Sequence, residues 1–454
     1  MTAVRYVAYD ERGLFDELRA HEYARLDADN QAYLDFTGSA LYSQRQITAH
    51  ADRLSKSVLG NPHSENGPSL ISTAIIGEAK RRVLEFLDAS ADDYAVCFTA
   101  NTSAAIRLVA ESYPFGPADG LVLSSDNHNS MNGIREFARV KGAPVRYVAL
   151  DDELRLASPL TTLRSFECGG LFGFPAQSNF SGVRHPLSLV SDAQRLGYTV
   201  LLDAAAFLPT NRLSLRRYPA DFVALSMYKI TGYPTGVGAL VARRESLARL
   251  QRPWFAGGTV EYASVQHGTH LLIDRNGEGF EDGTPAFIDI AAVSDGLRFL
   301  EEIGIHQINA HVSRHRARFV MQLANVRTKS GRQLAIVYGP RSSHGCGATV
   351  AFNLIAPDGT PIPFSKVVER ARNEGVSLRG GCFCNPGASE TAFGFPPGAT
   401  ARCLSLANAD GFTIEGFSEC LGPGVPVGAV RASMGIATND RDIDRALAVI
   451  RSFV

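Results

Sequence analysis

The sequence has 454 residues, of which 45% are hydrophobic and 20% charged, and its formal net charge at pH 7 is −1. A near-neutral chain without a block of like charge excludes the basic surfaces typical of proteins that bind nucleic acids or anionic membranes. The N-terminus MTAVRYVAYDERG is too charged for a signal peptide, and no apolar run reaches the roughly 18 to 20 residues of a membrane span.

In chain order, short apolar runs alternate with helical patterns from Tyr94 onward. Near-continuous apolar strands separated by helices predict a mostly parallel sheet that is buried on both faces. Ligands bind such sheets at the carboxyl ends of the strands, and several polar residues follow predicted strands directly. The predicted strands are 94–99, 120–125, 144–150, 168–174, 198–203, 221–226 and 237–243.

The pattern from residue 285 to the end predicts a second structural domain, and the length of the chain also favours two domains. Residues 285–303 have the pattern of one long helix, and an α+β pattern follows it. We therefore expect an N-terminal segment (1–40) that packs on the small domain, a large domain (41–303) and a small C-terminal domain (304–454). The stretch 394–424 is rich in Gly and Pro and predicts an irregular surface loop.

The seven cysteines are odd in number and scattered along the chain. This pattern is not that of a disulfide framework, and it favours the reducing cytosol and hence a cytoplasmic location. One C-x-C pair without a second Cys or His pair nearby is a weak metal signal, so no metal site is expected. The cysteines are Cys97, Cys168, Cys346, Cys382, Cys384, Cys403 and Cys420.

Two residues at strand ends carry the central chemical prediction. Lys229 lies in a Gly- and Pro-rich turn between two apolar strands, where an aldehyde cofactor can form a Schiff base with its amine. Asp203 ends the preceding strand VLLD, and such a carboxylate pairs with the ring nitrogen of pyridoxal phosphate (PLP). The alternative for Asp203 is a helix cap, and the alternative for Lys229 is a solvated loop lysine.

Three further residues follow the predicted strands 94–99 and 120–125. Thr102 and Ser103 begin a helix, where hydroxyls and free N–H groups hold phosphate; ordinary helix capping is the alternative, and it is favoured for this motif taken alone. His128 follows its strand and is expected to stack on a cofactor ring and to move protons. The alternative for His128 is a structural role.

The C-terminal half adds a thiol loop and an arginine. In LRGGCFCNPGA, Cys382 and Cys384 lie in a Gly-rich segment that we expect to be mobile and extended, with Arg379 favouring a nucleophilic thiolate. Arg431 lies inside the apolar strand VGAVRAS, where its guanidinium requires a planar carboxylate. An amino-acid substrate supplies one, and an internal salt bridge is the alternative.

Together these segments resemble class V, fold-type I PLP enzymes. They are most similar to the N-terminal desulfurase-like domain of molybdenum cofactor sulfurases and, more distantly, to cysteine desulfurases. The resemblance runs in order over about 33–434 and implies an α/β large domain with a mostly parallel seven-stranded sheet plus a smaller α+β domain. Its motifs are YLDFTGSALYS, GNPHS, FTANTS, DNHNS, FPAQSNFSG, VLLDAAAF, PADFVALSMYKITGYPTGVGALVAR, FAGGTV, FEDGTPAF, LRGGCFCNPGA and GAVRASMG.

The resemblance assigns a role to each matching position. It implies that Thr284 reaches the phosphate of a neighbouring subunit, and hence a homodimer. The other implied roles are the Schiff-base lysine for Lys229, the ring-nitrogen partner for Asp203, ring stacking for His128, the phenolic-oxygen partner for Asn179, phosphate binding for Thr102, Ser103, Ser226 and Tyr228, the persulfide-forming thiol for Cys384, carboxylate binding for Arg431, and the substrate pocket for Arg379 and His63.

The chain departs from the family pattern in three ways. We expect the protein to lack the C-terminal domain of the full sulfurases, and hence to use an acceptor other than the molybdenum cofactor. Ser389 stands where a third loop cysteine is common, and Ala206 replaces a glutamine. The expected reaction is removal of sulfur from cysteine, as an enzyme persulfide, for a protein or small-molecule acceptor. The alternatives are a β-eliminating C–S lyase, an aminotransferase or aldol-type enzyme, and a silent relative.

Overall fold

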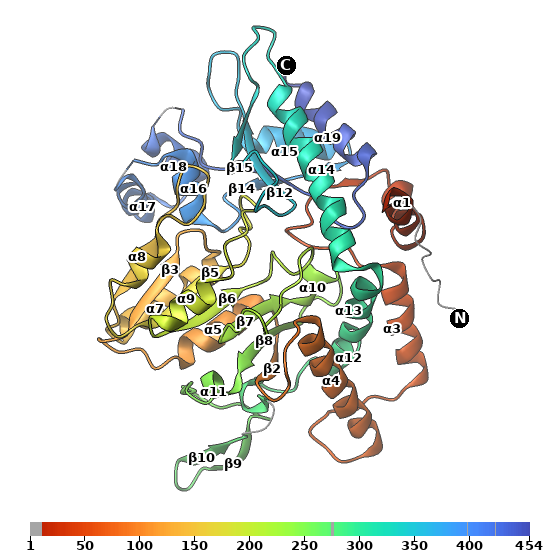
Figure 1. Ribbon diagram of the computed structural model, residues 1–454, viewed down its shortest axis with the longest axis vertical. Helices are drawn as coiled ribbons and strands as arrows, with labels where there is room; N and C mark the ends of the chain where they lie inside the picture. The colour runs from red at the N-terminus through yellow and green to blue at the C-terminus, as the bar shows by residue number, and fades with distance from the viewer. Residues whose placement is uncertain (1–10, 274–276, 397, 423) are drawn as a thin grey trace.

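The computed structural model describes residues 11–273, 277–396, 398–422 and 424–454. Its centre is a seven-stranded sheet of order β2-β8-β7-β6-β5-β3-β4 (Figure 1). Neighbours from β7 to β4 pair in parallel, and only β8 runs antiparallel to its neighbours β2 and β7. The predicted mostly parallel α/β sheet is thus confirmed. Its strands are β2 (Tyr94–Thr99), β3 (Gly120–Ser124), β4 (Val145–Val148), β5 (Gly170–Pro175), β6 (Tyr198–Asp203), β7 (Phe222–Ser226) and β8 (Gly238–Arg243).

Helices cover both faces of this sheet. Successive strand side chains point to opposite faces, so an unbroken apolar run serves two cores at once. Leu201 and Leu121 belong to a cluster with α5 (Thr102–Ser112), whereas Val200 and Val122 belong to a second cluster. The second cluster also contains buried residues of α4 (Gly67–Phe86) and α9 (Leu189–Arg195).

A second sheet organises the C-terminal part of the chain. Four antiparallel strands follow the order β11-β12-β15-β14, and α14 (Ile305–Asn325), α15 (Phe364–Asn373) and α19 (Asp440–Arg451) accompany them (Figure 1). The early strand β1 (Ala32–Tyr33) pairs in parallel with β13 (Val376–Ser377), and Asp35 forms a bridge with Ser433. The strands of the sheet are β11 (Ala335–Tyr338), β12 (Thr349–Leu354), β14 (Arg379–Gly381) and β15 (Ala429–Ser433).

The junction near residue 304 differs from the expected single helix. Residues 285–303 contain two helices, α12 (Phe287–Ile290) and α13 (Val293–Ile303), so the prediction of one continuous helix is wrong. Gly304, with a φ of 93°, ends α13, and α14 begins at the next residue. A positive φ is natural for glycine, which explains why the chain turns here. The proposed boundary between 303 and 304 falls at this turn.

The stretch 394–424 is also more regular than predicted. It contains α17 (Ala399–Asp410) and α18 (Ile414–Leu421), and three of its glycines lie at the ends of these helices. Gly398 precedes α17, and Gly411 and Gly422 follow the two helices.

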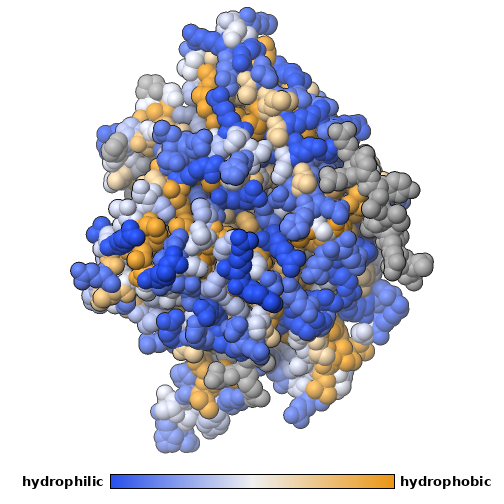
Figure 2. Space-filling model, viewed as in Figure 1, coloured by the Kyte–Doolittle hydropathy of each residue, from blue (hydrophilic) through white to orange (hydrophobic). Residues whose placement is uncertain are grey.

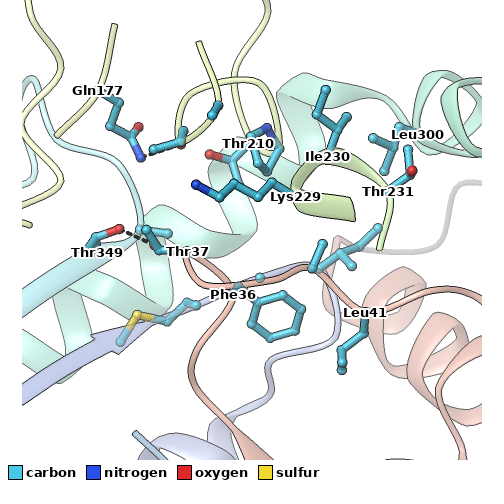
Figure 3. Close-up of a pocket in the computed structure, with 18 of the residues that line it drawn as sticks. Phe36, Thr37, Leu41, Gln177, Thr210, Lys229, Ile230, Thr231, Leu300 and Thr349 are labelled. Carbon is cyan, nitrogen blue, oxygen red and sulfur yellow. Dashed lines mark hydrogen bonds between the residues drawn. The ribbon is translucent and has the colours of Figure 1, made fainter. Parts of the chain in front are cut away.

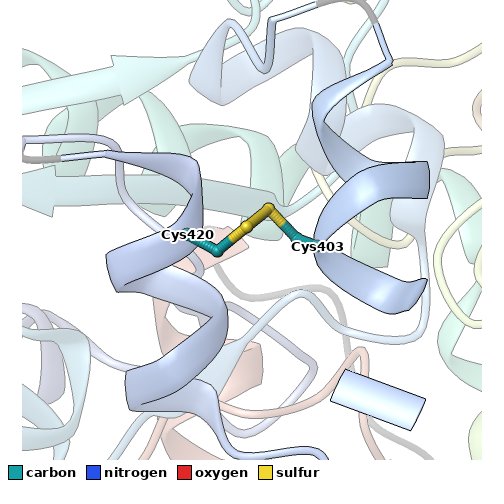
Figure 4. The surroundings of a disulfide bond; sticks show 2 residues. All are labelled: Cys403 and Cys420. Carbon is teal, nitrogen blue, oxygen red and sulfur yellow. A yellow bond between two sulfur atoms is a disulfide. The ribbon is translucent and has the colours of Figure 1, made fainter. Parts of the chain in front are cut away.

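A disulfide joins these two helices (Figure 4). Cys403 of α17 and Cys420 of α18 are bonded, so the scattered cysteines include one disulfide that their pattern in the sequence did not predict. The helices share only a small apolar cluster, and a covalent link compensates for so small a core. The thiols of Cys97 and Cys346 are buried, whereas those of Cys168, Cys382 and Cys384 are exposed.

Within the described residues, the longest helices are too short or too polar to cross a lipid bilayer.

Candidate active site

A cavity of about 400 Å³ opens at the carboxyl ends of the central strands. Parallel strands bring their carboxyl ends to one edge, so residues far apart in the sequence meet there. Eight of the residues singled out from the sequence line this cavity: Thr102, Ser103, His128, Asn179, Asp203, Ser226, Tyr228 and Lys229. Ser130 and Gln177 also line it and were missed, although both lie in the quoted motifs DNHNS and FPAQSNFSG.

Lys229 lies in the short helix α10 (Met227–Ile230), directly after β7. Burial lowers the pKa of its amine; the charge of Asp203 opposes this shift, and those of Arg431 and Arg379 add to it. A lowered pKa leaves more of the amine neutral and nucleophilic. Lys229 and Gln177 also line a second, small cavity of about 30 Å³. Figure 3 shows the Lys229 side chain pointing toward Gln177.

Asp203 ends β6, the strand next to β7. The strand that ends at Asp203 and the strand that leads into Lys229 are therefore neighbours in the sheet. Asp203 Oδ1 accepts the N–H of Ala205 at 2.9 Å, and the chain continues in turns rather than in a helix. The carboxylate therefore supports a turn and not a helix N-terminus, and its residue faces the cavity.

Hydroxyl groups gather at the start of α5. Asn101 caps the helix by accepting the N–H of Ala104, and Thr102 is its first residue. The hydroxyls of Thr102 and Ser226 are 2.6 Å apart, and the Thr102 N–H donates to Ser226 Oγ. Ser103 is hydrogen bonded to Ser130. Hydroxyls beside the first N–H groups of an eleven-residue helix form an environment suited to phosphate.

His128 is held in one orientation at the rim of the cavity. Its Nδ1 accepts the N–H of Ser130 at 3.2 Å, so a neutral ring carries its proton on Nε2. Burial, followed by the charge of Lys229, lowers the pKa of His128, and Asp203 opposes this shift. The ring is therefore neutral near pH 7, with Nε2 as its only hydrogen-bond donor.

The segment that carries the two thiols is a tight turn. The Asn385 N–H donates to the Cys382 carbonyl at 3.0 Å, and the central residues Phe383 and Cys384 have φ values of 56° and 54°. The expectation of an extended loop is wrong, because both central residues adopt left-handed backbone conformations. Phe383 is buried and packs against Phe180, which anchors the turn between two exposed thiols.

Hydrogen bonds fasten this turn to the cavity wall. Asn179 donates its side-chain amide to the Phe383 carbonyl at 2.7 Å, and the Asn129 N–H donates to the Cys384 carbonyl at 2.7 Å. Asn385 caps α16 (Pro386–Phe393) and donates to Asn179 Oδ1 at 3.0 Å. Cys384 thus lies beside the cavity without lining it, and the amide of Asn179, the implied phenolic-oxygen partner, is already engaged.

Beneath the turn lies a buried carboxylate that sequence reasoning missed. Asp126 is fully buried and accepts hydrogen bonds from Ser178 and Asn385 at 2.8 and 2.7 Å. Its other oxygen lies 2.8 Å from Nε2 of the buried His185. The available signal was its position two residues before His128, at the end of a strand.

Arg431 and Arg379 share one carboxylate, that of Asp35. They lie directly opposite each other on β15 and β14, and Asp35 pairs with Arg431 at 2.9 Å and with Arg379 at 2.6 Å. Burial lowers the pKa of Arg431, and Asp35 opposes that shift. The Arg431 guanidinium also donates to the Asn179 carbonyl and lies 4.8 Å above the Phe383 ring. An internal salt bridge is therefore present, next to the cavity.

Thr284 and His63 lie apart from the other site residues. Thr284 lines a neighbouring cavity of about 360 Å³, which shares Ala100 and Gly236 with the cavity around Lys229. His63 lines a further cavity, of about 430 Å³, together with Lys80. In the described part of the chain, neither residue reaches the Lys229 cavity.

The residues around the cavity fit PLP. The buried amine of lowered pKa matches the aldehyde of that group, and the carboxylate on the adjacent strand matches its ring nitrogen. The neutral imidazole at the rim matches the ring face, and the hydroxyl-rich helix start matches the phosphate. The fold and the site therefore define a PLP-dependent enzyme of fold type I. Residues 32–446 match the model of the aminotransferase class-V family, and the chain belongs to that family.

The chain is similar to longer proteins. It is 33% identical over 485 residues to the molybdenum cofactor sulfurase of Arabidopsis thaliana, covering 96% of this chain and 58% of that protein. The molybdenum cofactor sulfurase of Solanum lycopersicum is 34% identical over 477 residues, covering 96% and 57%. The chain thus spans less than three fifths of the length of these relatives.

Solved structures share the fold along almost the whole chain. The cysteine desulfurase of Thermococcus onnurineus NA1 superposes with a TM-score of 0.80 at 24% identity, covering 97% of this chain and 98% of that one. The cysteine desulfurase CsdA of Escherichia coli gives 0.77 at 20%, covering 98% and 99%. The cystine C–S lyase C-DES gives 0.71 at 16%, covering 95% and 99%. At these identities the likeness describes the fold.

Proposed function

We propose that this protein is a cysteine desulfurase-like enzyme that transfers sulfur from cysteine to its own Cys384. The observation that carries the proposal is the turn 382–385, which is hydrogen bonded to Asn179 and Asn129 and so holds an exposed thiol at the edge of the Lys229 cavity. The similarity to sulfurases and cysteine desulfurases supports the same reaction.

In this proposal each residue has a defined task. PLP, when bound, serves as an electron sink for the substrate carbon chain. The Lys229 amine would hold the cofactor, and Asp203 would pair with its ring nitrogen and keep it protonated. Lys229, or His128 in the tautomer that carries its proton on Nδ1 and donates it to Ser130 Oγ, removes the α-proton of the substrate. Arg431 binds the substrate carboxylate.

The sulfur-transfer step belongs to Cys384. Its thiolate forms a bond to the substrate sulfur while the carbon–sulfur bond of the substrate breaks, and the electron pair of that bond remains with the carbon. A proton completes alanine, and the enzyme retains the sulfur as a persulfide, so no external oxidant is required. A later thiol or other nucleophile accepts this sulfur.

The test is product analysis after incubation with cysteine. We expect alanine and one persulfide per active site in the wild type, and neither in Cys384→Ser, although Cys384→Ser retains the visible absorption of bound PLP. Cys382→Ser is the matched control, because its thiol is also exposed in the same turn. Normal turnover by Cys384→Ser would transfer the role to Cys382 or end the proposal, and pyruvate plus sulfide would identify a C–S lyase.

We also propose a homodimer. Apolar side chains are exposed at the end of α3 (Gln44–Lys56), at the start of α4 and in the hairpin of β9 (Val260–Ser264) and β10 (Thr269–Leu272). Figure 2 shows hydrophobic atoms over the lower end of α4. A second copy that covers this surface also accounts for Thr284 and His63, which then face the active site of the partner. The exposed residues are Leu54, Val58, Leu70, Ile71, Tyr262, Val265 and Leu271.

Light scattering tests the dimer. The wild type is expected at twice the chain mass, and Leu70→Lys is expected to shift it toward the monomer. Leu404→Lys, at an exposed leucine of α17, is the control and should remain dimeric. A wild-type monomer that binds PLP tightly would refute the dimer. We propose a cytoplasmic location as well, since persulfide chemistry needs the reduced thiols of Cys382 and Cys384; the Cys403–Cys420 disulfide is an exception in such a reducing compartment.

A further inference from the structure

The pairing of Arg379 and Arg431 poses an electrostatic problem that Asp35 solves. Two like charges directly opposite each other on neighbouring strands repel, and this pair lies beside the proposed substrate site. Asp35 binds both: its Oδ2 accepts from Nε and Nη2 of Arg379 at 2.9 and 2.6 Å, and its Oδ1 accepts from Arg379 Nε at 3.1 Å and from Arg431 Nη2 at 2.9 Å. One negative charge thus serves two positive ones.

The hydrogen-bond inventory shows which arginine is left incomplete. Asp35 engages the Nε–Nη2 edge of Arg379 fully. Arg431 is 3% exposed and uses Nη1 and Nη2, but its buried Nε has no partner among the described residues. A buried donor without an acceptor is costly, so Arg431 is the arginine that a carboxylate ligand completes.

We propose that Asp35 is a specificity-determining residue: by neutralising one of the two guanidiniums, it leaves charge for a single carboxylate and excludes amino acids with two acid groups. This inference rests on the proposed function, because it treats Arg431 as the substrate-binding arginine. A substrate such as cysteine then brings the cluster to neutrality. Aspartate or cysteine sulfinate adds a second negative charge that Asp35 repels at close range.

The surroundings of Asp35 keep the pair in place without adding charge. The Tyr33 hydroxyl donates to the Ser39 carbonyl, and burial, with a further contribution from Asp35, raises the pKa of Tyr33 to about 12, so Tyr33 remains neutral. A Cβ atom on Gly38 would lie 2.5 Å from Arg379 Nη2 and 2.6 Å from Asp35 Oδ2. Only glycine at 38 leaves room for this ion pair.

Calorimetric binding of L-alanine and L-aspartate to the PLP-loaded protein tests the inference. The two ligands share the α-carboxylate and differ by one acid group, and binding requires no desulfuration. We expect the wild type to prefer alanine, and Asp35→Asn to move the ratio of the two dissociation constants toward aspartate by roughly tenfold. Asp295→Asn is the matched control, since its carboxylate is 14% exposed against 13% for Asp35 and pairs with Arg53 away from the site.

A second variant protects the test against misfolding. Gly38→Ala leaves every charge in place but displaces the exposed end of Arg379 from Asp35, and should move the ratio in the same direction by a smaller factor. An unchanged ratio in the folded variants, or equal loss of both ligands, overturns the inference. If the wild type forms no alanine from cysteine, the proposed function fails, while the alanine-to-aspartate ratio still decides the role of Asp35.

Discussion

Asn385 donates its side-chain amide to Asp126 Oδ1 at 2.7 Å, and this bond ties the residue after Cys384 to the loop that carries His128. The same asparagine caps α16 through its side-chain oxygen. Two left-handed residues in a row cost on the order of 1 to 3 kcal/mol each, so the turn needs such support. Asp126 and Asn385 are therefore positioning residues for the thiol.

Asn385→Asp separates capping from positioning. Aspartate still caps α16, but it cannot donate, and it places a carboxylate against Asp126. We expect kcat for alanine release to fall by about tenfold or more, with little change in KM for cysteine, because the lost hydrogen bond orients the nucleophile. Alkylation of Cys384 should also change in rate. Thr413→Ala, which removes the cap of α18 alone, should leave kcat and the alkylation rate unchanged. The prediction requires that Asn385→Asp change kcat more than it changes KM.

Asp203→Asn should keep PLP bound yet reduce turnover by roughly two orders of magnitude or more, because the ring nitrogen loses its ionic partner. The measurement is the visible spectrum together with the rate of alanine formation. The Ala205 N–H donates to Asp203 Oδ1 and can donate in the same way to the amide oxygen of the variant, so the turn itself should persist. Near-normal turnover would reduce Asp203 to a turn-supporting residue.

Removal of the disulfide by Cys403→Ser together with Cys420→Ser should destabilise the α17–α18 segment. The bond spans 17 residues. Closing a loop of this size lowers the conformational entropy of the unfolded chain and so stabilises the folded state by about 3 kcal/mol. Limited proteolysis should therefore cut the variant faster within 394–424, while cysteine turnover stays close to that of the wild type. Equal cleavage rates would show that the apolar cluster alone holds the helices.

The histidines of α14 should make stability depend on pH. Burial lowers the pKa of His311 to about 3 and that of His315 to about 4; Arg314 adds to both shifts, and Asp440 opposes the second. Below pH 6.5 the two histidines are protonated in the unfolded chain but remain neutral in the folded protein. The free energy of unfolding therefore falls as the pH decreases from 6.5 toward 4.

Urea unfolding at pH 7 and pH 5 checks this, with His315→Gln as the comparison. Between the two pH values the variant should lose about 1 to 2 kcal/mol less free energy of unfolding than the wild type. Identical losses would mean that His315 is charged in the folded protein.

The sequence predicted what depends on local pattern. Apolar runs predicted the buried strands, and the order of those strands along the chain brought Asp203 beside Lys229. Asp35 was missed because its partner Arg431 lies 396 residues away, and no periodicity links two such positions. The turn conformation was missed because neither Phe383 nor Cys384 favours a left-handed backbone; hydrogen bonds from distant segments impose it.

The third exposed thiol, Cys168, precedes β5 and so lies at the amino end of the strands, at the edge of the sheet opposite the Lys229 cavity. A charged alkylating reagent reaches it in the folded protein as it reaches Cys382 and Cys384, whereas Cys97 and Cys346 stay protected. Because substrate at the cavity does not alter its surroundings, Cys168 provides an internal reference within each molecule. Sulfur gained at Cys384 can then be quantified by peptide mass as a ratio to Cys168, independent of protein concentration.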